Sequence, residues 1–464
     1  MFEVIVLRIR SIPLLLGLCL VTGCSKIPPA DDGTVFEEIY WRINNNAEWR
    51  QDCCYNQEYQ EFIDNALANK LTADSAIQIA LFNNPKVQAT FQELGIARAD
   101  LVAAGLLSNP SFELEIRYPN TQGLKTNIEY LITSSLLDLF LIPLRRQMAE
   151  LNFQQTKLEV AHTILNLAFD VRETFYELIA EQKKIDRLQS ILELTSIINE
   201  IFSKQIEVGN INSLEFQLSQ LRLLEGKQEL LSAQTHVIQL REKLNRLLGF
   251  NEDIFLNLPE NLPDVDYCGF DLCTLESIAL EERLDLQVAR FEIIALRQKL
   301  GLKEWWSYSN LKVGISGERD TDGTNVIGPG FSGELPIFNY GQADRMRLIA
   351  ELKKAQENLA VLEIKALSEV REAHKLLMSY LQMVKEYQNQ LIPMQEQVST
   401  SSEQLYNVMG IGIDKLLENK RIEMRGKHNY SEIVKKYLVA RVELDRALGG
   451  NLFVLLSKQE CLKE

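Results

Sequence analysis

The chain has 464 residues, of which 46% are hydrophobic, and a formal net charge of −15 at pH 7. This length is enough for two or three ordinary domains with buried cores. An acidic chain without a cluster of Lys and Arg is a poor binder of nucleic acid, so we expect no nucleic-acid partner.

Residues 1–23 have the pattern of a lipoprotein signal peptide. Two arginines precede an apolar run that is too short to span a membrane comfortably. The run ends in Leu20-Val21-Thr22-Gly23-Cys24, which resembles a bacterial lipobox. The resemblance implies cleavage before Cys24 and acylation of Cys24, for example with palmitate. Because Ser25 follows the cysteine in place of Asp, it also implies delivery to the outer membrane.

The second half of the chain repeats the first. Three landmarks match at nearly constant offsets of 199, 201 and 200 residues. They pair Leu106–Leu114 with Trp305–Val313, Val208–Ile211 with Met409–Gly412, and Leu247–Gly249 with Ala447–Gly449. A fixed offset indicates one duplicated architecture rather than unrelated domains.

The duplication divides the chain into six parts. The first repeat covers residues 71–249 and the second covers residues 273–450. The remaining parts are the signal peptide, an N-terminal linker (24–70), an inter-repeat linker (250–272) and a C-terminal tail (451–464).

Each repeat contains a predicted β-hairpin, at about residues 110–137 and 309–337. Apolar residues alternate with charged or polar ones, which directs one face of a strand to an apolar medium and the other to water. The apolar positions are Phe112, Leu114, Ile116, Ile128, Tyr130, Ile132, Leu311, Val313, Ile315, Ile327, Phe331 and Leu335. Strands of about 9–11 residues are long enough to cross a bilayer obliquely.

Four strands are too few to close a barrel, since the smallest single-chain barrels have about eight. An open sheet edge in hydrocarbon would leave backbone amides without partners. The strands are therefore expected to be shared between chains in a homo-oligomer.

A long helix is predicted after each hairpin. No Pro or Gly occurs from about Leu144 to Glu207, and an apolar stripe runs through Ile164, Ala168, Val171, Phe175 and Leu178. A helix of about 64 residues would span roughly 95 Å. A fibrous coiled coil is the alternative, but a plain coiled coil would have no use for the β-hairpins. The second copy, from about Gln342 to Val408, contains Pro393, which predicts a kink or a short break.

Several short motifs carry a resemblance to a known family. Leu71-Thr72-Ala73-Asp74-Ser75-Ala76, followed by Asn84-Pro85, is similar to that family's opening helix. Leu335-Pro336-Ile337-Phe338-Asn339-Tyr340-Gly341 is similar to its turn from the last strand into a long helix. Val208–Leu218 and Tyr406–Leu417 are similar to its two helical tips. On these motifs, residues 70–450 resemble the TolC-like outer-membrane efflux proteins, in their lipoprotein branch.

This resemblance implies a mainly α protein with a small transmembrane β part. Three chains would form an α-barrel and a 12-stranded β-barrel, with four strands from each chain. The homotrimer would extend from the outer-membrane lipid into the periplasm and serve as the passive exit duct of a tripartite efflux or secretion system. Its partners would be a periplasmic adaptor (membrane fusion) protein and an inner-membrane transporter, and residues 25–70 would wrap the outside of the tube.

The functional residues implied by the resemblance lie at the two tips. Gly209, Asn210, Gly410 and Gly412 would meet the adaptor, and Gly209 and Gly410 permit the positive φ of a tight helix reversal. Three further residues, Glu215, Asp414 and Tyr406, are candidates to line the closed aperture. For the two carboxylates, a solvated helix face is the alternative interpretation.

No catalytic residues are predicted, because the chain lacks a Gly-rich phosphate loop, an H-E-x-x-H motif and a G-x-S-x-G motif. The covalent lipid on Cys24 is the one non-protein group expected. Cys268 and Cys273 are close enough in sequence to form a disulfide, which the periplasm permits. None of the four histidines lies near these cysteines, so no metal site is predicted.

Two alternative functions are compatible with an exported helical chain. A periplasmic adaptor of the same pumps would show a Gly-rich β-domain between two hairpin helices, which is not visible here. A structural envelope lipoprotein would use the rods only as spacers, and it would have no use for two hairpins with membrane-strand alternation.

Overall fold

The structure is a computed structural model. It describes residues 33–49, 57–121, 123–135, 138–252, 254–265, 271–306, 312–333, 337–452 and 454–455. The predicted signal peptide, Cys24, Cys268, Leu311 and Leu335 lie outside the described residues, and what was predicted for them stays a prediction.

The elements form two series, which follow the same order apart from the N-terminal helices that open the first. The first series is α2 (Gly33–Ile43), α3 (Gln57–Ala68), α4 (Ala73–Asn83), α5 (Pro85–Ala104), β1 (Ser111–Arg117), β2 (Asn127–Ser135), α6 (Asp138–Glu207) and α7 (Ser213–Leu248). The second is α8 (Leu272–Glu282), α9 (Leu284–Trp306), β3 (Lys312–Arg319), β4 (Asn325–Ser332), α10 (Gln342–Glu386), the π-helix η1 (Tyr387–Leu391), α11 (Ile392–Asn407) and α12 (Ile413–Leu448). From α4 onward the two series correspond, which confirms the duplicated helix–hairpin–long helix–helix unit.

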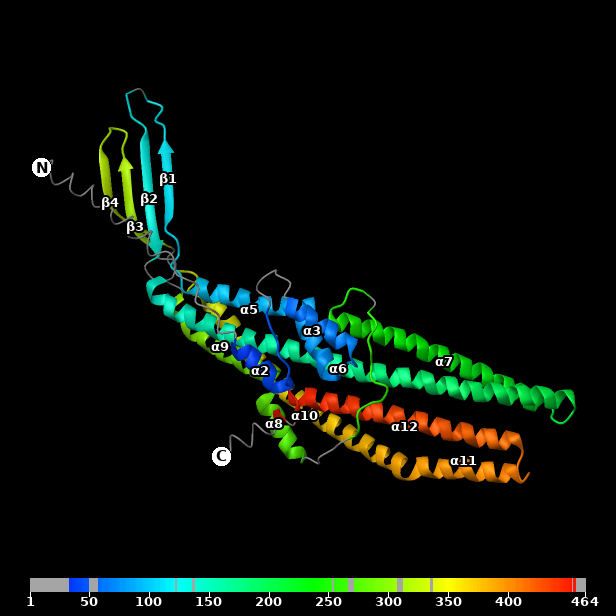
Figure 1. Cartoon of the computed structure of the whole chain (residues 1–464). Helices are drawn as coiled ribbons and strands as arrows, with labels where there is room; N and C mark the ends of the chain where they lie inside the picture. Colours follow the sequence, from blue (N-terminus) through cyan, green and yellow to red (C-terminus); the bar gives the residue numbers. More distant parts are fainter. Residues whose placement is uncertain are drawn as a thin grey trace.

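The molecule is a long helical rod with a small sheet projecting from one end (Figure 1). Two helical hairpins, α6–α7 and α10/α11–α12, point away from the sheet and reverse at the opposite end of the rod. Helix α6 has 70 residues, which corresponds to about 105 Å. No helix in the described part of the chain is both long enough and apolar enough to cross a membrane.

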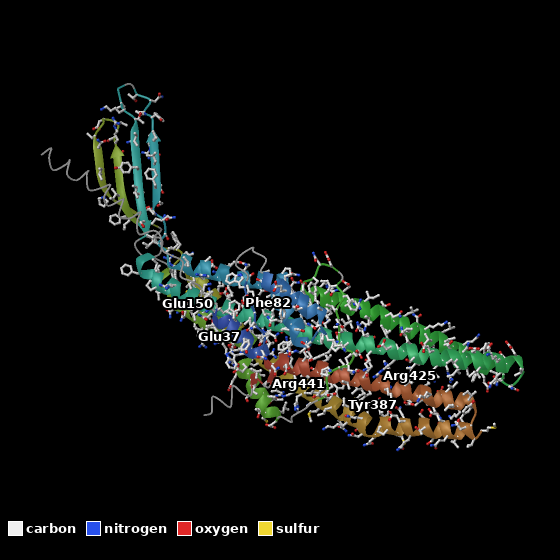
Figure 2. All side chains as sticks on the ribbon, in the orientation of Figure 1. Glu37, Phe82, Glu150, Tyr387, Arg425 and Arg441 are labelled. Atoms are coloured by element: carbon white, nitrogen blue, oxygen red, sulfur yellow. The ribbon has the colours of Figure 1, made fainter. Side chains whose placement is uncertain are left out.

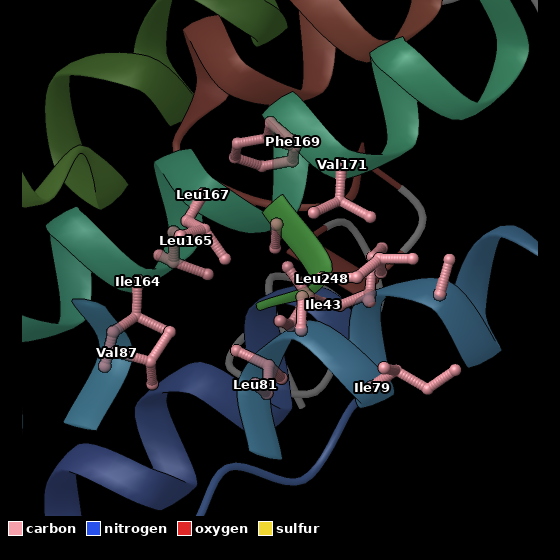
Figure 3. Close-up of a cluster of buried hydrophobic side chains, with 14 of the residues drawn as sticks. Ile43, Ile79, Leu81, Val87, Ile164, Leu165, Leu167, Phe169, Val171 and Leu248 are labelled. Atoms are coloured by element: carbon pink, nitrogen blue, oxygen red, sulfur yellow. The ribbon is translucent and has the colours of Figure 1, made fainter. Parts of the chain in front are cut away.

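The core lies in the middle of the rod, where α2 and α4 pack on α6 (Figure 3). The five residues of the predicted α6 stripe, from Ile164 to Leu178, are all buried there. A second core gathers α8, α10 and α12, including Val370, Leu377 and Leu444. The first core lies mostly in the first repeat but includes Leu284 and Val442 of the second, and Tyr176 packs against both cores.

The four strands form one antiparallel sheet in the order β1-β2-β3-β4. The register pairs Phe112 with Ile132, Ile132 with Ile315, and Val313 with Phe331, so these side chains lie on the same face. The predicted alternation is confirmed for the described positions. That face is apolar and largely exposed in the single chain, and β1 and β4 are edge strands without partners among the described residues.

The opposite face of the sheet is polar. Asn127 donates to the Glu318 carboxylate at 2.6 Å, and the Ser111 and Thr133 hydroxyls lie 2.7 Å apart. Strands of seven to nine residues are slightly shorter than the predicted 9–11. The sheet is therefore amphipathic, with one apolar and one polar face.

The two long helices differ in continuity. Helix α6 starts at Asp138, six residues earlier than predicted, and includes Pro143 in its second turn, where few backbone hydrogen bonds are lost. In the second copy, the predicted break at Pro393 is confirmed. It takes the form of the π-helix that begins at Tyr387, labelled in Figure 2, and the N–H of Ile392 donates to the Tyr387 carbonyl.

Candidate functional site

The first tip reverses the chain between α6 and α7 with a left-handed glycine. Gly209 has φ +75°, its N–H donates to the Ile206 carbonyl at 3.1 Å, and the Asn210 N–H donates to the Gln205 carbonyl at 2.9 Å. These two bonds satisfy carbonyls that the helix end would otherwise leave without partners. The predicted role of Gly209 in the helix reversal is confirmed.

The second tip has the same bonds but a different residue at the left-handed position. Met409, with φ +58°, donates to the Tyr406 carbonyl at 2.9 Å, and Gly410 donates to the Leu405 carbonyl at 2.7 Å. The positive φ predicted for Gly410 is therefore wrong. At an offset of 200, Gly209 aligns with Met409, and these two residues have equivalent geometry. An offset of 201 aligns Gly209 with Gly410, which is an identical residue at a different position of the turn.

The helices that leave the tips start differently. The Asn212 side chain accepts a hydrogen bond from the Glu215 N–H at 2.9 Å and caps α7. Gly412 precedes α12 and has no side chain to cap it. A Cβ at Gly412 would lie 2.3 Å from Asp414 Oδ1, so this carboxylate folds back over the helix start.

The three aperture candidates lie at the tips but are not brought together in one chain. Glu215 and Asp414 are exposed in the first turns of α7 and α12, on different hairpins. No ion pair or hydrogen bond joins them in the part of the chain that the structure describes. Tyr406 is partly exposed in the last turn of α11. Any ring of these side chains would need neighbouring chains.

A buried carboxylate of α12, Glu423, contacts α11 through Ser399 and was not anticipated from the sequence. It is 6% exposed and receives ion pairs from Lys420 at 2.8 Å and Lys427 at 2.9 Å. Burial opposes its ionisation, but hydrogen bonds from Lys420, Lys427 and Ser399 outweigh burial and lower the pKa of Glu423 to about 2. A single carboxylate among the many charged residues of α12 has no sequence signal that marks it as buried.

Two polar contacts in the tip-side half of the rod join the first hairpin to the second. Arg187 of α6 donates to the Lys427 carbonyl of α12, and burial lowers the pKa of Arg187. Arg222 of α7 lies 4.0 Å from Glu418 of α12. These contacts position α12 relative to α6 and α7, and nothing in the apolar periodicity of α6 could have identified Arg187.

Nearer the sheet, a pocket of about 410 Å³ lies where α6, α9, α10 and α12 meet. Arg446 on its wall pairs with Asp170 at 2.8 Å and Glu173 at 3.2 Å. Burial, followed by the carboxylates of Glu443 and Glu177, raises the pKa of Glu173. The pocket wall therefore carries charges of both signs, among them Arg446, Lys365 and Glu369.

The remaining predicted groups are only partly within the described residues. Cys273 is exposed at the start of α8, and its predicted partner Cys268 lies outside the described chain, so the disulfide stays a prediction. In the described ranges, no three His, Cys, Asp or Glu side chains are placed to hold a metal ion.

One comparison with known proteins matches a family model to most of the first repeat. Residues 76–250 match the family model described as outer membrane efflux protein. A search of the curated proteins gave no match.

Solved structures match over most of the chain. The Campylobacter jejuni CmeC outer membrane channel is 15% identical with a TM-score of 0.66, over 88% of this chain and 90% of that one. The Vibrio cholerae outer membrane protein VceC is 15% identical with a TM-score of 0.64, over 82% and 96%. The open state of the Neisseria gonorrhoeae MtrE outer membrane channel is 16% identical with a TM-score of 0.57, over 82% and 89%. At these identities the likeness establishes a TolC-like fold along both repeats.

Proposed function

We propose that the chain, whose residues 76–250 match the outer membrane efflux protein model, is the exit duct of a tripartite export system. In this role it is a passive channel across the periplasm and the outer membrane. The observation that carries the proposal is an amphipathic four-stranded sheet with two open edges at the end of a helical rod. The family is one of channels, and we propose no chemical step for this chain.

Closure of the sheet requires further copies of the chain. Edge strands β1 and β4 expose rows of N–H and C=O groups, which are costly in a bilayer. Pairing of β4 of one chain with β1 of the next satisfies both edges. Three chains then supply twelve strands, with the apolar face turned to lipid, and their helices form one tube.

The proposed surroundings of the trimer follow from the two ends of the rod. At the sheet end, a lipid on Cys24 anchors each chain to the outer membrane. At the other end, the tips at Gly209, Asn210, Gly410 and Gly412 meet a periplasmic adaptor that links the duct to an inner-membrane transporter. Between the two ends, α2 packs on α6 through Val35 and Ile39, which supports wrapping of the N-terminal linker around the rod.

We also propose that the tips close the duct. In a trimer, the exposed carboxylates of Glu215 and Asp414 and the Tyr406 side chain form rings at the narrow end. Six carboxylates in an aperture favour cations over anions. The links of Arg187 to Lys427 and of Arg222 to Glu418 hold the second hairpin beside the first in this arrangement.

Single-channel conductance of the purified trimer in planar bilayers tests this function. We expect discrete conductance steps that select cations, and the combined Glu215→Ala and Asp414→Ala substitutions should reduce the cation preference several-fold. The matched control replaces two exposed carboxylates far from the tips, Asp100→Ala and Glu357→Ala. Absence of any conductance, even after Arg187→Ala loosens the hairpins, would contradict a duct. Unchanged selectivity in the tip variant would contradict only the aperture.

A further inference from the structure

All four strand ends that face the rod meet the long helices at one level. Strands β1 and β3 start there from α5 and α9, and β2 and β4 end there before α6 and α10 (Figure 1). Two stretches carry the chain from the sheet into the rod, residues 138–147 and residues 337–347. We call these two stretches the junction. If the sheet lies in the outer membrane, the junction lies at the periplasmic surface of that membrane.

The junction exposes large apolar side chains in both repeats. Phe140 is 71% exposed, Tyr340 is 65% exposed, and Phe338 beside it is 91% exposed. Phe140 and Tyr340 occupy equivalent positions, 200 residues apart. Aromatic side chains are enriched where a membrane meets water, because they have an apolar body and tolerate the polar headgroup region.

The junction is also basic in an acidic protein. It holds four arginines, Arg145, Arg146, Arg345 and Arg347, against the two aspartates Asp138 and Asp344. The whole chain, by contrast, has a net charge of −15. Arg145 and Arg345 are equivalent positions, so the duplication preserves a basic residue five positions after an aromatic one in each repeat.

The aromatic and basic residues of the junction lie at different depths along the axis of the rod. Five residues of α6 separate Phe140 from Arg145, or about 7.5 Å, with the arginine farther from the sheet. On the proposed insertion, this depth is that of the phosphates of a lipid leaflet. Of the four junction arginines, Arg145 is half-buried and the other three are exposed. Arg347 pairs with Asp344 at 3.0 Å and Glu351 at 3.8 Å, but these pairs are on the surface, contribute little and compete weakly with a phosphate.

We propose that the junction binds the anionic phospholipid headgroups of the periplasmic leaflet, and that this contact sets the depth of the duct in the membrane. The inference rests on the proposed function, because it requires the sheet to be inserted. Arginine forks form paired hydrogen bonds to phosphate, and a basic side chain at an anionic lipid surface contributes about a fivefold preference. The adjoining exposed aromatic residues distinguish a lipid surface from a site for free phosphate.

Fluorescence quenching by brominated lipids tests the proposal on the full-length trimer reconstituted in vesicles. Trp305 and Trp306 end α9, the helix that precedes β3, and serve as reporters. We expect brominated phosphatidylglycerol to bind at least about fivefold more tightly than brominated phosphatidylcholine. Replacing all four junction arginines with Gln should bring this ratio close to one, whereas replacing them with Lys should largely retain it.

A charge-matched control replaces four exposed lysines along the rod with Gln: Lys227, Lys354, Lys375 and Lys385. This variant should keep the wild-type ratio. Equal quenching by both lipids in the wild-type protein, or the same loss in the lysine control, would overturn the proposal while leaving the duct intact. No quenching by either lipid would mean that the sheet is not inserted, and the proposed function itself would fail.

Discussion

In each repeat, the residue between the two short helices donates a hydrogen bond to a carbonyl at the end of the last helix. This contact, here called the joint, is made of neutral groups in the first repeat and of charged groups in the second. Asn84 donates to the Leu247 carbonyl at 2.8 Å, where α7 ends against α5. At the equivalent place Arg283 donates to the Ala447 carbonyl at 3.2 Å. An amide can satisfy one carbonyl at little cost, but a buried guanidinium also needs carboxylate partners.

These partners make the second joint a network. Arg283 is paired with Asp285 at 2.8 Å and with Glu369 of α10 at 2.6 Å. Burial disfavours the ionised form of Asp285, but the hydrogen bond and charge of Arg283 outweigh it and lower the pKa of Asp285. The second repeat therefore couples its joint to its long helix electrostatically.

The hairpins differ in the same direction. Helix α6 runs unbroken to its tip, whereas the second copy is divided by a π-helix, ends in a left-handed Met409 and is held by buried ions at Glu423. The long helix of the first hairpin is continuous, so we expect this hairpin to stay fixed. The second combines an irregular helix with polar contacts that can exchange partners, so it is the better candidate for movement in a gate.

Loss of the Arg283 side chain should have the largest effect on stability. Arg283→Ala removes the partner of Asp285 and leaves Glu369 with its longer pair to Lys365 at 3.6 Å, and we expect a cost of about 3–5 kcal/mol. Asn84→Ala, the matched change in the first repeat, should cost only about 1–2 kcal/mol. Thermal unfolding of both purified variants measures the difference, and equal costs would contradict a neutral first joint and an ionic second joint.

The next largest effect is expected at the helix ends Gly249 and Gly449. Both have φ near +80°, so the backbone strain caused by alanine is the same. A Cβ at Gly249 would lie 2.6 Å from the Cα of Asn84, but a Cβ at Gly449 would lie 3.1 Å from the Cα of Arg283. We expect Gly249→Ala to cost about 3 kcal/mol and Gly449→Ala about 1–2 kcal/mol. A larger cost for Gly449→Ala than for Gly249→Ala in chemical denaturation would show that the backbone around Gly249 moves aside more easily.

Glu423 should make the second hairpin sensitive to acid. Its pKa is about 2 in the folded chain against 4.5 without its partners, so its contribution is complete above about pH 4.5 and is lost as the pH falls toward 2. Glu423→Gln should cost about 2 kcal/mol at pH 7 and almost nothing at pH 2. Proteolysis of the α11–α12 hairpin across this pH range gives the comparison. Glu225→Gln, an exposed carboxylate on α7, is the control and should have no effect.

The smallest expected effect is a gain. Met409 is 95% exposed at φ +58°, so Met409→Gly should relieve backbone strain and stabilise the second tip by about 1 kcal/mol. Gly209→Ala should destabilise the first tip by a similar amount. Hydrogen exchange of the amides at each tip measures both changes, and a destabilised Met409→Gly tip would mean that its side chain has a contact in the assembly.

The features predicted correctly from the sequence were those with a periodic signal. Alternation identified the strands around Phe112 and Ile315, the stripe from Ile164 to Leu178 identified the buried face of α6, and Pro393 identified the break. Pairwise polar contacts have no period, so the partners of Arg187 and Glu423 could not be found. The left-handed Met409 was missed because side chains other than glycine rarely adopt that conformation.

The central claim is that the open four-stranded sheet is one third of a closed barrel. Imaging of the detergent-extracted particles, with measurement of their rotational symmetry, tests it most directly. We expect a hollow three-fold particle in which β4 of each chain pairs with β1 of the next, on a helical tube of about 105 Å set by α6. A compact or two-fold particle with unpaired strand edges would contradict the claim and favour a structural envelope lipoprotein.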